Sequence, residues 1–219
     1  DYNHELCNLY NVIINQPKEL KKDLAKFESK HSKEFYMDVR EWDRKPSYHK
    51  KSPLSKATRF IYLNKAGFNG LYRVNSKEQN NVPWGQRDKV VLDSNDNINT
   101  LSKKLKNIKI IHNSFEITVN TAKKGDFIYF DPPYVPLSKS SNFVGYTKVG
   151  FEMEMQFKLK ELLDELTQKG VNWMQSNSSA PEICELYKDY SLNFVDASRS
   201  INCKGDGRGK IKEVIITNY

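Results

Sequence analysis

An acidic residue, two prolines and a tyrosine stand together at Asp131-Pro132-Pro133-Tyr134, and these four residues are the part of the sequence best suited to chemistry. They directly follow residues 127–130, a short aromatic and apolar run after a Gly-Asp turn, which predicts a buried strand. Proline has no backbone N–H and cannot donate to a strand ladder, so the strand is expected to end at Asp131. In open α/β sheets, ligands bind at the carboxyl ends of the strands.

An amino group attached to a flat ring is the substrate that suits these residues. The carboxylate of Asp131 and the carbonyl of Pro132 can accept the two N–H bonds of an exocyclic amine, which frees its lone pair for attack. The ring of Tyr134 can stack on the base. This is catalysis by positioning and electrostatic preorganisation, with no covalent intermediate. A strand that ends in a Pro-Pro turn beside an exposed tyrosine is the alternative interpretation, and the aromatic strand before it favours the functional one.

The sequence FDPPY resembles the catalytic motif of amino-group DNA methyltransferases. The longer segment of residues 131–151 is similar to the Dam family of adenine-N6 methyltransferases, which act at GATC. The resemblance implies an α/β fold: a Rossmann-like S-adenosyl-L-methionine-dependent methyltransferase sheet with an inserted helical and β-hairpin target-recognition domain. It assigns the catalytic domain to residues 1–15 and 106–219 and target recognition to residues 16–105. The cofactor implied is S-adenosyl-L-methionine, and no metal is expected.

Composition agrees with such an enzyme without establishing it. The net charge of +8 and the pI near 9.2 permit a nucleic-acid partner. Three widely spaced cysteines form no metal or disulfide pattern, which favours a reducing cytoplasm. No apolar stretch reaches the roughly 20 residues of a membrane span, and no signal peptide is recognisable.

Two segments resemble cofactor-binding parts of the family. The Asp1-Tyr2-Asn3 start is similar to a segment whose aspartate binds the ribose hydroxyls of the cofactor, although a helix cap is the alternative. Residues 108–111 predict a strand, and the Ser114-Phe115 pair after it resembles the segment that packs a phenylalanine near the cofactor adenine. Together with Asp131, these residues form the expected cofactor set.

Residues 66–88 alternate polar and aromatic residues between glycines, which predicts a β-hairpin with its tip at 76–80. A hairpin that carries arginine and asparagine can enter a DNA groove, although a solvated surface hairpin is the alternative. FNGLYRVN and the following NVP-x-G resemble the target-recognition hairpin of the Dam family. By that resemblance Phe68 wedges into the base stack, and base contacts fall to Asn69, Leu71, Arg73 and Pro83. Arg73 would read O6 and N7 of a guanine, and Pro83 would meet a thymine methyl.

One position departs from the family pattern. The family has arginine directly after NVP-x-Gly, whereas this chain has Gln86 there and Arg87 next. Either Arg87 substitutes after a shift of one residue, or the outer base contact is weaker. The departure bears on the GATC target and not on the chemistry.

Two further loops are expected to contact DNA. The loop after the proline pair resembles the N-F-x-x-Y segment of the family, in which an aromatic side chain contacts the flipped base or its phosphate; its residues are Asn142, Phe143 and Tyr146. Residues 198–210 form a basic, glycine-rich loop that suits phosphate contacts, although a flexible loop with solvated charges is an equal alternative. Its candidates are Arg199, Lys204, Arg208 and Lys210.

The family's glycine-rich cofactor turn has no counterpart in this sequence. Three explanations are open: the segment was cut away upstream, a separate polypeptide supplies it in trans, or cofactor binding was lost. The first is favoured because Asp1 and the other cofactor motifs are intact. The leading hypothesis is therefore a base-flipping adenine methyltransferase of duplex DNA, with a cognate restriction endonuclease as a possible counterpart. A non-catalytic DNA-binding relative is one alternative, and methylation of cytosine N4, RNA or a protein amide is another.

Overall fold

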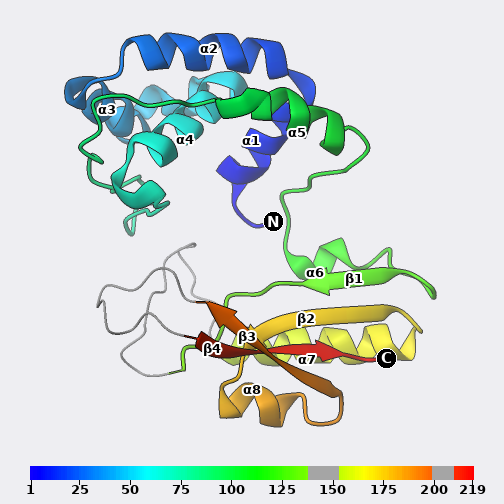
Figure 1. Ribbon diagram of the computed structural model, residues 1–219. Helices are drawn as coiled ribbons and strands as arrows, with labels where there is room; N and C mark the ends of the chain where they lie inside the picture. Colours follow the sequence, from blue (N-terminus) through cyan, green and yellow to red (C-terminus); the bar gives the residue numbers. More distant parts are fainter. Residues whose placement is uncertain (138–152, 199–209) are drawn as a thin grey trace. The chain divides into compact units, whose positions relative to one another are not determined.

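The computed structural model describes residues 1–137, 153–198 and 210–219, which form two compact units (Figure 1). The helical unit contains Asp1–Phe115. The sheet unit contains the described residues from Glu116 to Tyr219. Each unit is described by itself.

Five α-helices and four short 3₁₀ helices build the helical unit. Side chains cap three of the α-helices, since Asn3, Ser32 and Ser52 each accept a first-turn backbone N–H. Proline is the first residue of two of the α-helices, a position where its missing N–H would have no partner within the helix. The α-helices are α1 (His4–Asn15), α2 (Pro17–Ser29), α3 (Lys33–Arg40), α4 (Pro53–Ala66) and α5 (Asn97–Leu105). The 3₁₀ helices are η1 (Glu41–Arg44), η2 (Pro46–Lys50), η3 (Phe68–Gly70) and η4 (Ser94–Asp96).

One apolar cluster holds these helices together, and helix α1 is part of it. Leu9, Val12 and Ile13 of α1 are buried in the same cluster as residues of α2, α3, α4 and α5. The compact units therefore divide differently from the expected domains, which grouped residues 1–15 with the catalytic part. The physical reason is the apolar face of α1, which packs on α4 and α5. The functional division into catalytic and recognition parts stays a prediction.

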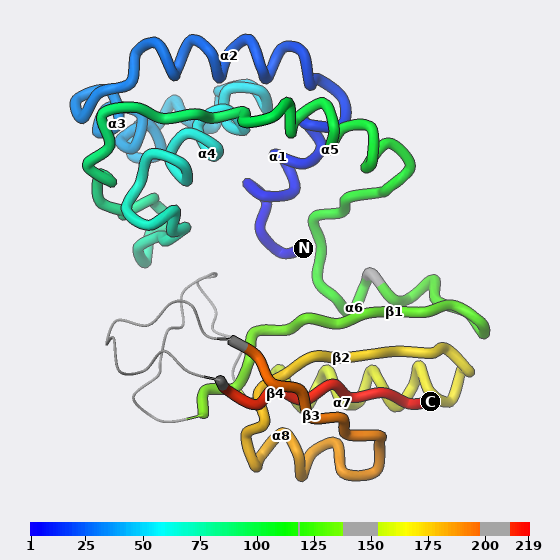
Figure 2. Tube along the Cα trace, viewed as in Figure 1, coloured from blue at the N-terminus to red at the C-terminus, as the bar shows by residue number. Residues whose placement is uncertain are grey.

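A four-stranded mixed sheet forms the second unit. Its strands are β1 (Phe127–Phe130), β2 (Asn172–Ser178), β3 (Ser191–Ser198) and β4 (Lys210–Thr217), and its helices are α6 (Phe115–Thr118), α7 (Met153–Gln168) and α8 (Pro181–Leu186). The strand order is β1-β2-β4-β3, with β1 parallel to β2 and β4 antiparallel to both its neighbours (Figure 2). This mixed α/β arrangement is consistent with a methyltransferase fold.

Helix α7 crosses from β1 to β2 and packs on one face of the sheet. Leu159, Leu163 and Leu166 of α7 are buried, as are Trp173 of β2 and Val214 of β4. The indole N–H of Trp173 donates to the Leu163 carbonyl at 3.1 Å, which ties the helix to the sheet. Gly170, just past α7, has φ +71°, the left-handed conformation that the sequence predicts for a glycine at this helix end.

Two sequence expectations about elements need correction. Strand β1 is not buried along its length: Phe127 and Tyr129 are 56% and 53% exposed, because β1 stands at the sheet edge and α7 covers only one face. Residues 108–111 form no strand, since they pair with no ladder.

None of the helices among the described residues is long and apolar enough to span a membrane.

Candidate active site and nucleic-acid interface

The carboxylate of Asp131 stands at the end of β1, where the sequence places it, and the neighbouring strand β2 fixes it. The Ser176 hydroxyl donates to Asp131 Oδ1 at 2.7 Å and accepts from the Tyr129 hydroxyl at 2.9 Å. Ser176 is 2% exposed, so its hydroxyl has little freedom to turn away. One carboxylate oxygen is therefore occupied and the orientation of the group is set. Sequence patterns do not indicate this partnership, because β1 and β2 meet only in the fold.

Buried amides hold the backbone that follows Asp131. Gln156 Nε2 of α7 donates to the Pro133 carbonyl at 3.1 Å, and its Oε1 accepts from Asn177 Nδ2 at 3.2 Å. Asn177 Oδ1 accepts the Val135 N–H at 3.2 Å, and the Ser178 hydroxyl donates to the Val135 carbonyl at 2.6 Å. Proline leaves this segment unable to join a ladder, so side chains take the place of a neighbouring strand. Gln156 lies among the buried residues of α7. A glutamine at an apolar position of a helical pattern is the sequence signal that could have indicated its role.

Two acceptors at this loop have no donor among the described residues. Within residues 1–137, 153–198 and 210–219, nothing donates to Asp131 Oδ2 or to the Pro132 carbonyl, and no lysine or arginine pairs with Asp131. Asp131 is exposed, so a ligand can reach it. An ionised carboxylate accepts hydrogen bonds and donates none. The loop therefore presents an anionic and a neutral acceptor from adjacent residues.

Tyr134 is half-buried beside this pair of acceptors. Its hydroxyl donates to Glu213 Oε2 at 3.3 Å, which fixes the ring. Partial burial raises the pKa of Tyr134 above its ordinary value, and the negative charges of Glu213 and Asp131 act in the same direction. The side chain therefore stays neutral and keeps its proton at physiological pH.

The predicted hairpin of residues 66–88 exists, but as an irregular loop and not as a regular ladder. Two isolated antiparallel bridges join its arms, Gly67 to Trp84 and Val74 to Asn80. A Cβ on Gly85 would lie 2.6 Å from the Ala66 carbonyl oxygen, so only glycine allows the arms to approach this closely. The tip turns at the predicted position, where Glu78 has φ +60°.

The side chains predicted to contact DNA lie on the outside of this loop. Phe68 is 50% exposed, so its ring is accessible from solvent. Asn69, with φ 52°, and Pro83 are exposed, and Leu71 is half-buried. The exposed guanidinium of Arg73 bonds Asn81 across the loop. The fold therefore gathers these five residues on one loop and leaves them accessible.

The Gln86-Arg87 departure has a structural counterpart. Gln86 adopts φ +54°, a conformation uncommon for residues other than glycine. His31 Nε2 lies 3.0 Å from the Arg87 carbonyl, and the His31 ring packs on Trp84 with a centroid distance of 4.9 Å. The backbone of Arg87 is thus fastened to the helical scaffold while its side chain is exposed.

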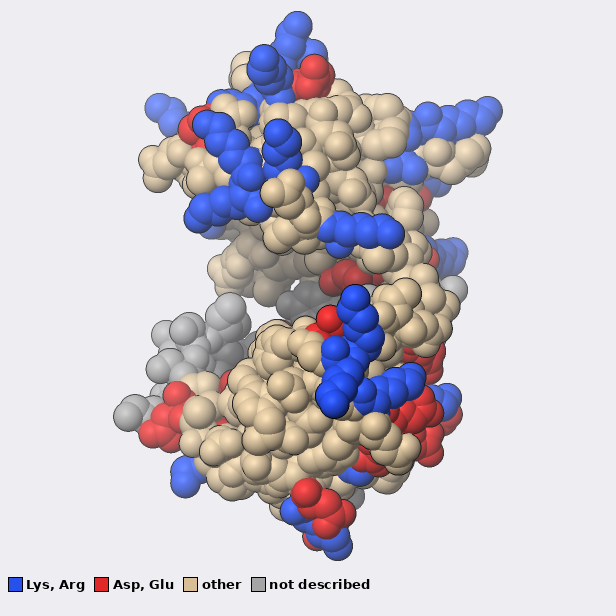
Figure 3. All heavy atoms as spheres, turned by 90° about the vertical axis from the view of Figure 1, so that its right-hand side faces the viewer, with Lys and Arg blue, Asp and Glu red and all other residues tan. Residues whose placement is uncertain are grey.

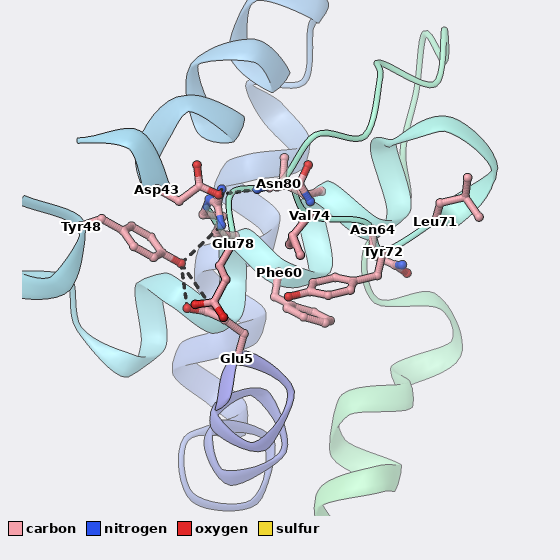
Figure 4. Close-up of a pocket in the computed structure, with 12 residues that line it drawn as sticks. Glu5, Asp43, Tyr48, Phe60, Asn64, Leu71, Tyr72, Val74, Glu78 and Asn80 are labelled. Carbon is pink, nitrogen blue, oxygen red and sulfur yellow. Dashed lines mark hydrogen bonds and ion pairs between the residues drawn. The ribbon is translucent and has the colours of Figure 1, made fainter. Parts of the chain in front are cut away.

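Buried charges support the loop from below. Asp43 and Arg59 form an ion pair at 2.6 Å with side chains only 8% and 7% exposed. Asp43 also accepts from Arg44 and from the backbone N–H of Asn80. Asp43, Arg59 and Asn80 line a small cavity of about 40 Å³, in which Tyr48 and Glu5 face one another (Figure 4). Burial raises the pKa of Tyr48, so it remains a hydrogen-bond donor to Glu5.

Basic side chains are numerous on the helical unit, and Figure 3 shows lysines and arginines projecting from its surface in the upper part of the view. Two of them lie over rings of the same unit: Lys51 over Trp42 and Lys56 over Tyr48. Such a surface suits a polyanion.

Among the predicted cofactor residues, Asp1 and the segment before Ser114 come together in the helical unit. The backbone nitrogen of Asp1 donates to the Ile111 carbonyl at 3.0 Å, and the Asn113 N–H donates to the Asp1 carbonyl at 3.1 Å (Figure 2). Asp1 Oδ1 accepts the Asn3 N–H at 2.7 Å, so Asp1 is a local turn partner as well as a candidate ribose ligand. Ser114 and Phe115 are half-buried at the end of this unit, while Asp131 belongs to the sheet unit.

Several predicted DNA contacts lie outside the described residues: Asn142, Phe143, Tyr146, Arg199, Lys204 and Arg208. Lys210 is the first residue of β4.

Comparison with known proteins connects this geometry to a family. A type II methyltransferase of Lactococcus lactis subsp. cremoris, M1.LlaDCHI, is 43% identical over all of this chain and 78% of its own length. The type II methyltransferase M.MjaIII of Methanocaldococcus jannaschii is 37% identical over the same shares. A DNA adenine methylase of Vibrio cholerae is 30% identical over 98% of this chain and 77% of its own length. The family profile described as D12 class N6 adenine-specific DNA methyltransferase matches residues 1–201, and the chain belongs to that family.

Proposed function

We propose that this adenine-specific DNA methyltransferase transfers a methyl group from S-adenosyl-L-methionine to N6 of an adenine flipped out of duplex DNA, with GATC as its target. The observation that carries the proposal is the pair of open acceptors at the end of β1, Asp131 Oδ2 and the Pro132 carbonyl. Family membership supports adenine as the base.

The geometry of the acceptors gives each residue a role. The exocyclic amine of adenine carries two N–H bonds, one for each acceptor. Because Ser176 already occupies Asp131 Oδ1, the amine is expected at Oδ2. Holding both hydrogens draws the nitrogen towards tetrahedral geometry and directs its lone pair outwards. As the new N–C bond forms, the methyl carbon would leave the donor's sulfur, which would become a neutral thioether, and the surplus proton would pass from N6 to Asp131 Oδ2 or to water. Tyr134, kept neutral by its raised pKa, offers its ring as a stacking surface.

The methyl donor is assigned by its chemical fit. When bound, S-adenosyl-L-methionine supplies an electrophilic methyl carbon on a positively charged sulfur. Asp1 Oδ2 accepts no hydrogen bond from the described residues and would take the ribose hydroxyls, as carboxylates do in dinucleotide folds. Phe115, half-buried after Ser114, would pack against the adenine ring of the donor.

Duplex DNA is the substrate that best explains the exposed side chains of the recognition loop, the loop of residues 66–88. N6 is not accessible to an active site while the adenine is stacked in the duplex, so the base must leave the stack. An exposed phenylalanine such as Phe68 can wedge into the space that remains. Arg73 and Arg87 are then available for guanine, and Leu71 and Pro83 for apolar contact with thymine methyl groups. Two relatives are named as type II methyltransferases, which favours a restriction endonuclease as a counterpart in the cell, without direct contact.

The experiment is methylation of a GATC duplex by the wild type and by Asp131→Ala and Asp131→Asn, with tritiated donor. Wild-type methylation and its loss in Asp131→Ala, by at least about a thousandfold, are expected because both positioning and charge are removed. Asp131→Asn tests whether charge is needed beyond shape. Binding of DNA is expected to persist in both variants, and calorimetry measures the affinity of the wild type for the donor. Unchanged methylation in Asp131→Ala would exclude the proposed chemistry, and salt-sensitive DNA binding without any donor affinity in the wild type would identify a non-catalytic relative.

A further inference from the structure

The side chain of Arg73 is already held in the structure, by one partner and on one edge. Arg73 Nε donates to Asn81 Oδ1 at 2.7 Å, and Arg73 Nη2 donates to the Asn81 carbonyl at 2.9 Å. The Asn81 N–H returns a bond to the Arg73 carbonyl at 3.1 Å. The two residues therefore face each other across the loop with three hydrogen bonds between them.

The guanidinium group has five N–H bonds in a fixed plane, and this contact uses only two of them. The two hydrogens on Nη1 and the second hydrogen on Nη2 receive no acceptor within the described part of the chain. One hydrogen on Nη1 and the second hydrogen on Nη2 form the outer edge of the fork, next to the edge that Asn81 holds. That edge carries two parallel N–H bonds, which is the arrangement that matches O6 and N7 of a guanine.

Asn81 is itself held from the protein interior. The residue before it, Asn80, is 6% exposed; its N–H donates to Asp43 Oδ2 at 2.7 Å and its carbonyl accepts from Arg44 Nη2 at 2.7 Å. The residue after it, Val82, is fully buried, and its carbonyl accepts from the Tyr36 hydroxyl at 2.9 Å. Buried groups thus fix the backbone on both sides of Asn81 (Figure 4 shows Asp43 and Asn80).

We propose that Asn81 is a positioning residue for base recognition: it grips the inner edge of Arg73 and presents the outer edge to one guanine of the target. The inference rests on the proposed function, because it needs Arg73 to read DNA. It adds the reason why a long, exposed side chain reads a base selectively. An unheld arginine samples many rotamers and meets phosphates as readily as bases, whereas a held arginine loses little freedom on binding.

The test compares a GATC duplex with duplexes in which 7-deazaguanine replaces the guanine of one strand or the other, which removes the N7 acceptor alone. Methylation (kcat/KM) and DNA binding without donor are measured for the wild type, Asn81→Ala, Asn81→Asp and Arg73→Ala. Ser76→Ala, an exposed change at the tip of the same loop, is the matched control. Thermal melting of every variant checks that the loop substitutions leave the fold intact.

The wild type and Ser76→Ala are expected to lose about tenfold on one of the two 7-deazaguanine duplexes, the size of a good base contact. Arg73→Ala is expected to be insensitive to the replacement. Asn81→Ala removes the Oδ1 acceptor and keeps the backbone carbonyl, so the guanidinium is held at one point and can pivot away from the base. The sensitivity of this variant to 7-deazaguanine is expected to fall to within about twofold of none. Asn81→Asp keeps the acceptor and is expected to recover the sensitivity.

Two outcomes separate the inference from the function beneath it. If Arg73→Ala becomes insensitive but Asn81→Ala keeps the full tenfold loss, Arg73 reads the base and the proposal for Asn81 is wrong. If Arg73→Ala retains the sensitivity of the wild type, or if the wild type shows none on either duplex, Arg73 does not read N7. The proposed base contact of Arg73 is then wrong, and the proposal for Asn81 is wrong with it. DNA binding measured without the methyl donor distinguishes the same outcomes if the chain does not methylate DNA.

Discussion

The recognition loop of the helical unit and the Asp131–Tyr134 loop of the sheet unit pose the same structural problem and solve it with different chemistry. Each is an irregular segment without a regular strand partner, so side chains must satisfy its backbone. Beneath the recognition loop the partners are charged: Asp43 takes the Asn80 N–H and Arg44 the Asn80 carbonyl. Behind the Asp131 loop they are neutral: Gln156, Asn177 and Ser178.

The difference follows the charge that each loop must offer. Asp131 works as an acceptor only while its negative charge is not neutralised, and a buried arginine beside it would compete with the substrate for the same oxygens. Amides and hydroxyls position the loop without that competition. If the loop of residues 66–88 contacts DNA as proposed, the positive charges of Arg44 and Arg59 beneath it act in the favourable direction. Under the proposed function, charged groups support the loop whose partner is the DNA anion. Neutral groups support the loop in which Asp131 is itself the anion.

The largest effect is expected from breaking the charged support. Asp43→Ala leaves Arg59 buried without its partner and the Asn80 N–H without an acceptor. The loss of one member of a buried ion pair costs about 3–5 kcal/mol of unfolding free energy. Denaturant unfolding measures it, with Asp38→Ala as the matched control, because Asp38 pairs with Lys45 at the surface and should cost less than about 1 kcal/mol. Equal costs in the two variants would contradict a special role for the buried pair.

A smaller effect, on rate and not on stability, is expected from Ser176→Ala. The change removes the hydroxyl that orients Asp131, and a hydrogen bond to a charged group contributes about 1.5–3 kcal/mol. We therefore expect kcat to fall by about 10–100-fold while KM for DNA changes little.

Ser179→Ala is the control for Ser176, since its hydroxyl donates to the Lys212 carbonyl and not to the loop. A rise in KM at constant kcat in Ser176→Ala would show that the hydroxyl serves binding, and the orienting role would be abandoned.

The neutral support is tested by Gln156→Leu. Leucine fills similar space but leaves the Pro133 carbonyl without its donor and Asn177 Nδ2 without its acceptor, which costs about 1–3 kcal/mol. Because the loop loses its anchor, methylation should fall together with stability. Gln168→Leu, at the exposed end of the same helix, should change neither. A stable Gln156→Leu variant with full activity would show that the amides are not needed to shape the loop.

The sequence predicts the parts of both loops that depend on local rules. A proline pair ends a strand wherever it occurs, so the position of Asp131 is predictable, and Gly170 is predictable from helix-end geometry. The supports were not predictable, since Asp43 looks like one charge among many between residues 38 and 44 and its burial depends on Arg59, sixteen positions away. The exposure of Phe127 was missed for the same reason: an apolar run shows what a strand can bury, and only the neighbouring elements decide which face is covered.

The smallest effect expected is that of Tyr36→Phe, and its pH dependence sharpens the comparison. Tyr36 is fully buried and donates to the Val82 carbonyl, a neutral bond within the otherwise charged support. Its removal should cost about 0.5–1.5 kcal/mol at pH 8. Burial raises the pKa of Tyr36, whereas the unfolded chain titrates near pH 10. The unfolded state therefore releases this proton first, and the stability that Tyr36 contributes is complete below about pH 10 and declines as pH rises towards the folded pKa.

The difference in unfolding free energy between the wild type and Tyr36→Phe should consequently shrink as pH rises above about 10. A buried tyrosine away from Tyr36, such as Tyr187, titrates in both proteins and cancels in the difference. Denaturant unfolding at a series of pH values measures this. A difference that stays constant through the alkaline range would mean that Tyr36 ionises as easily in the folded protein as in the unfolded chain. In that case water would reach the interior beneath the recognition loop despite its burial. The free-energy cost of burying charge there would then be small, and the two loops would differ less than their contacts indicate.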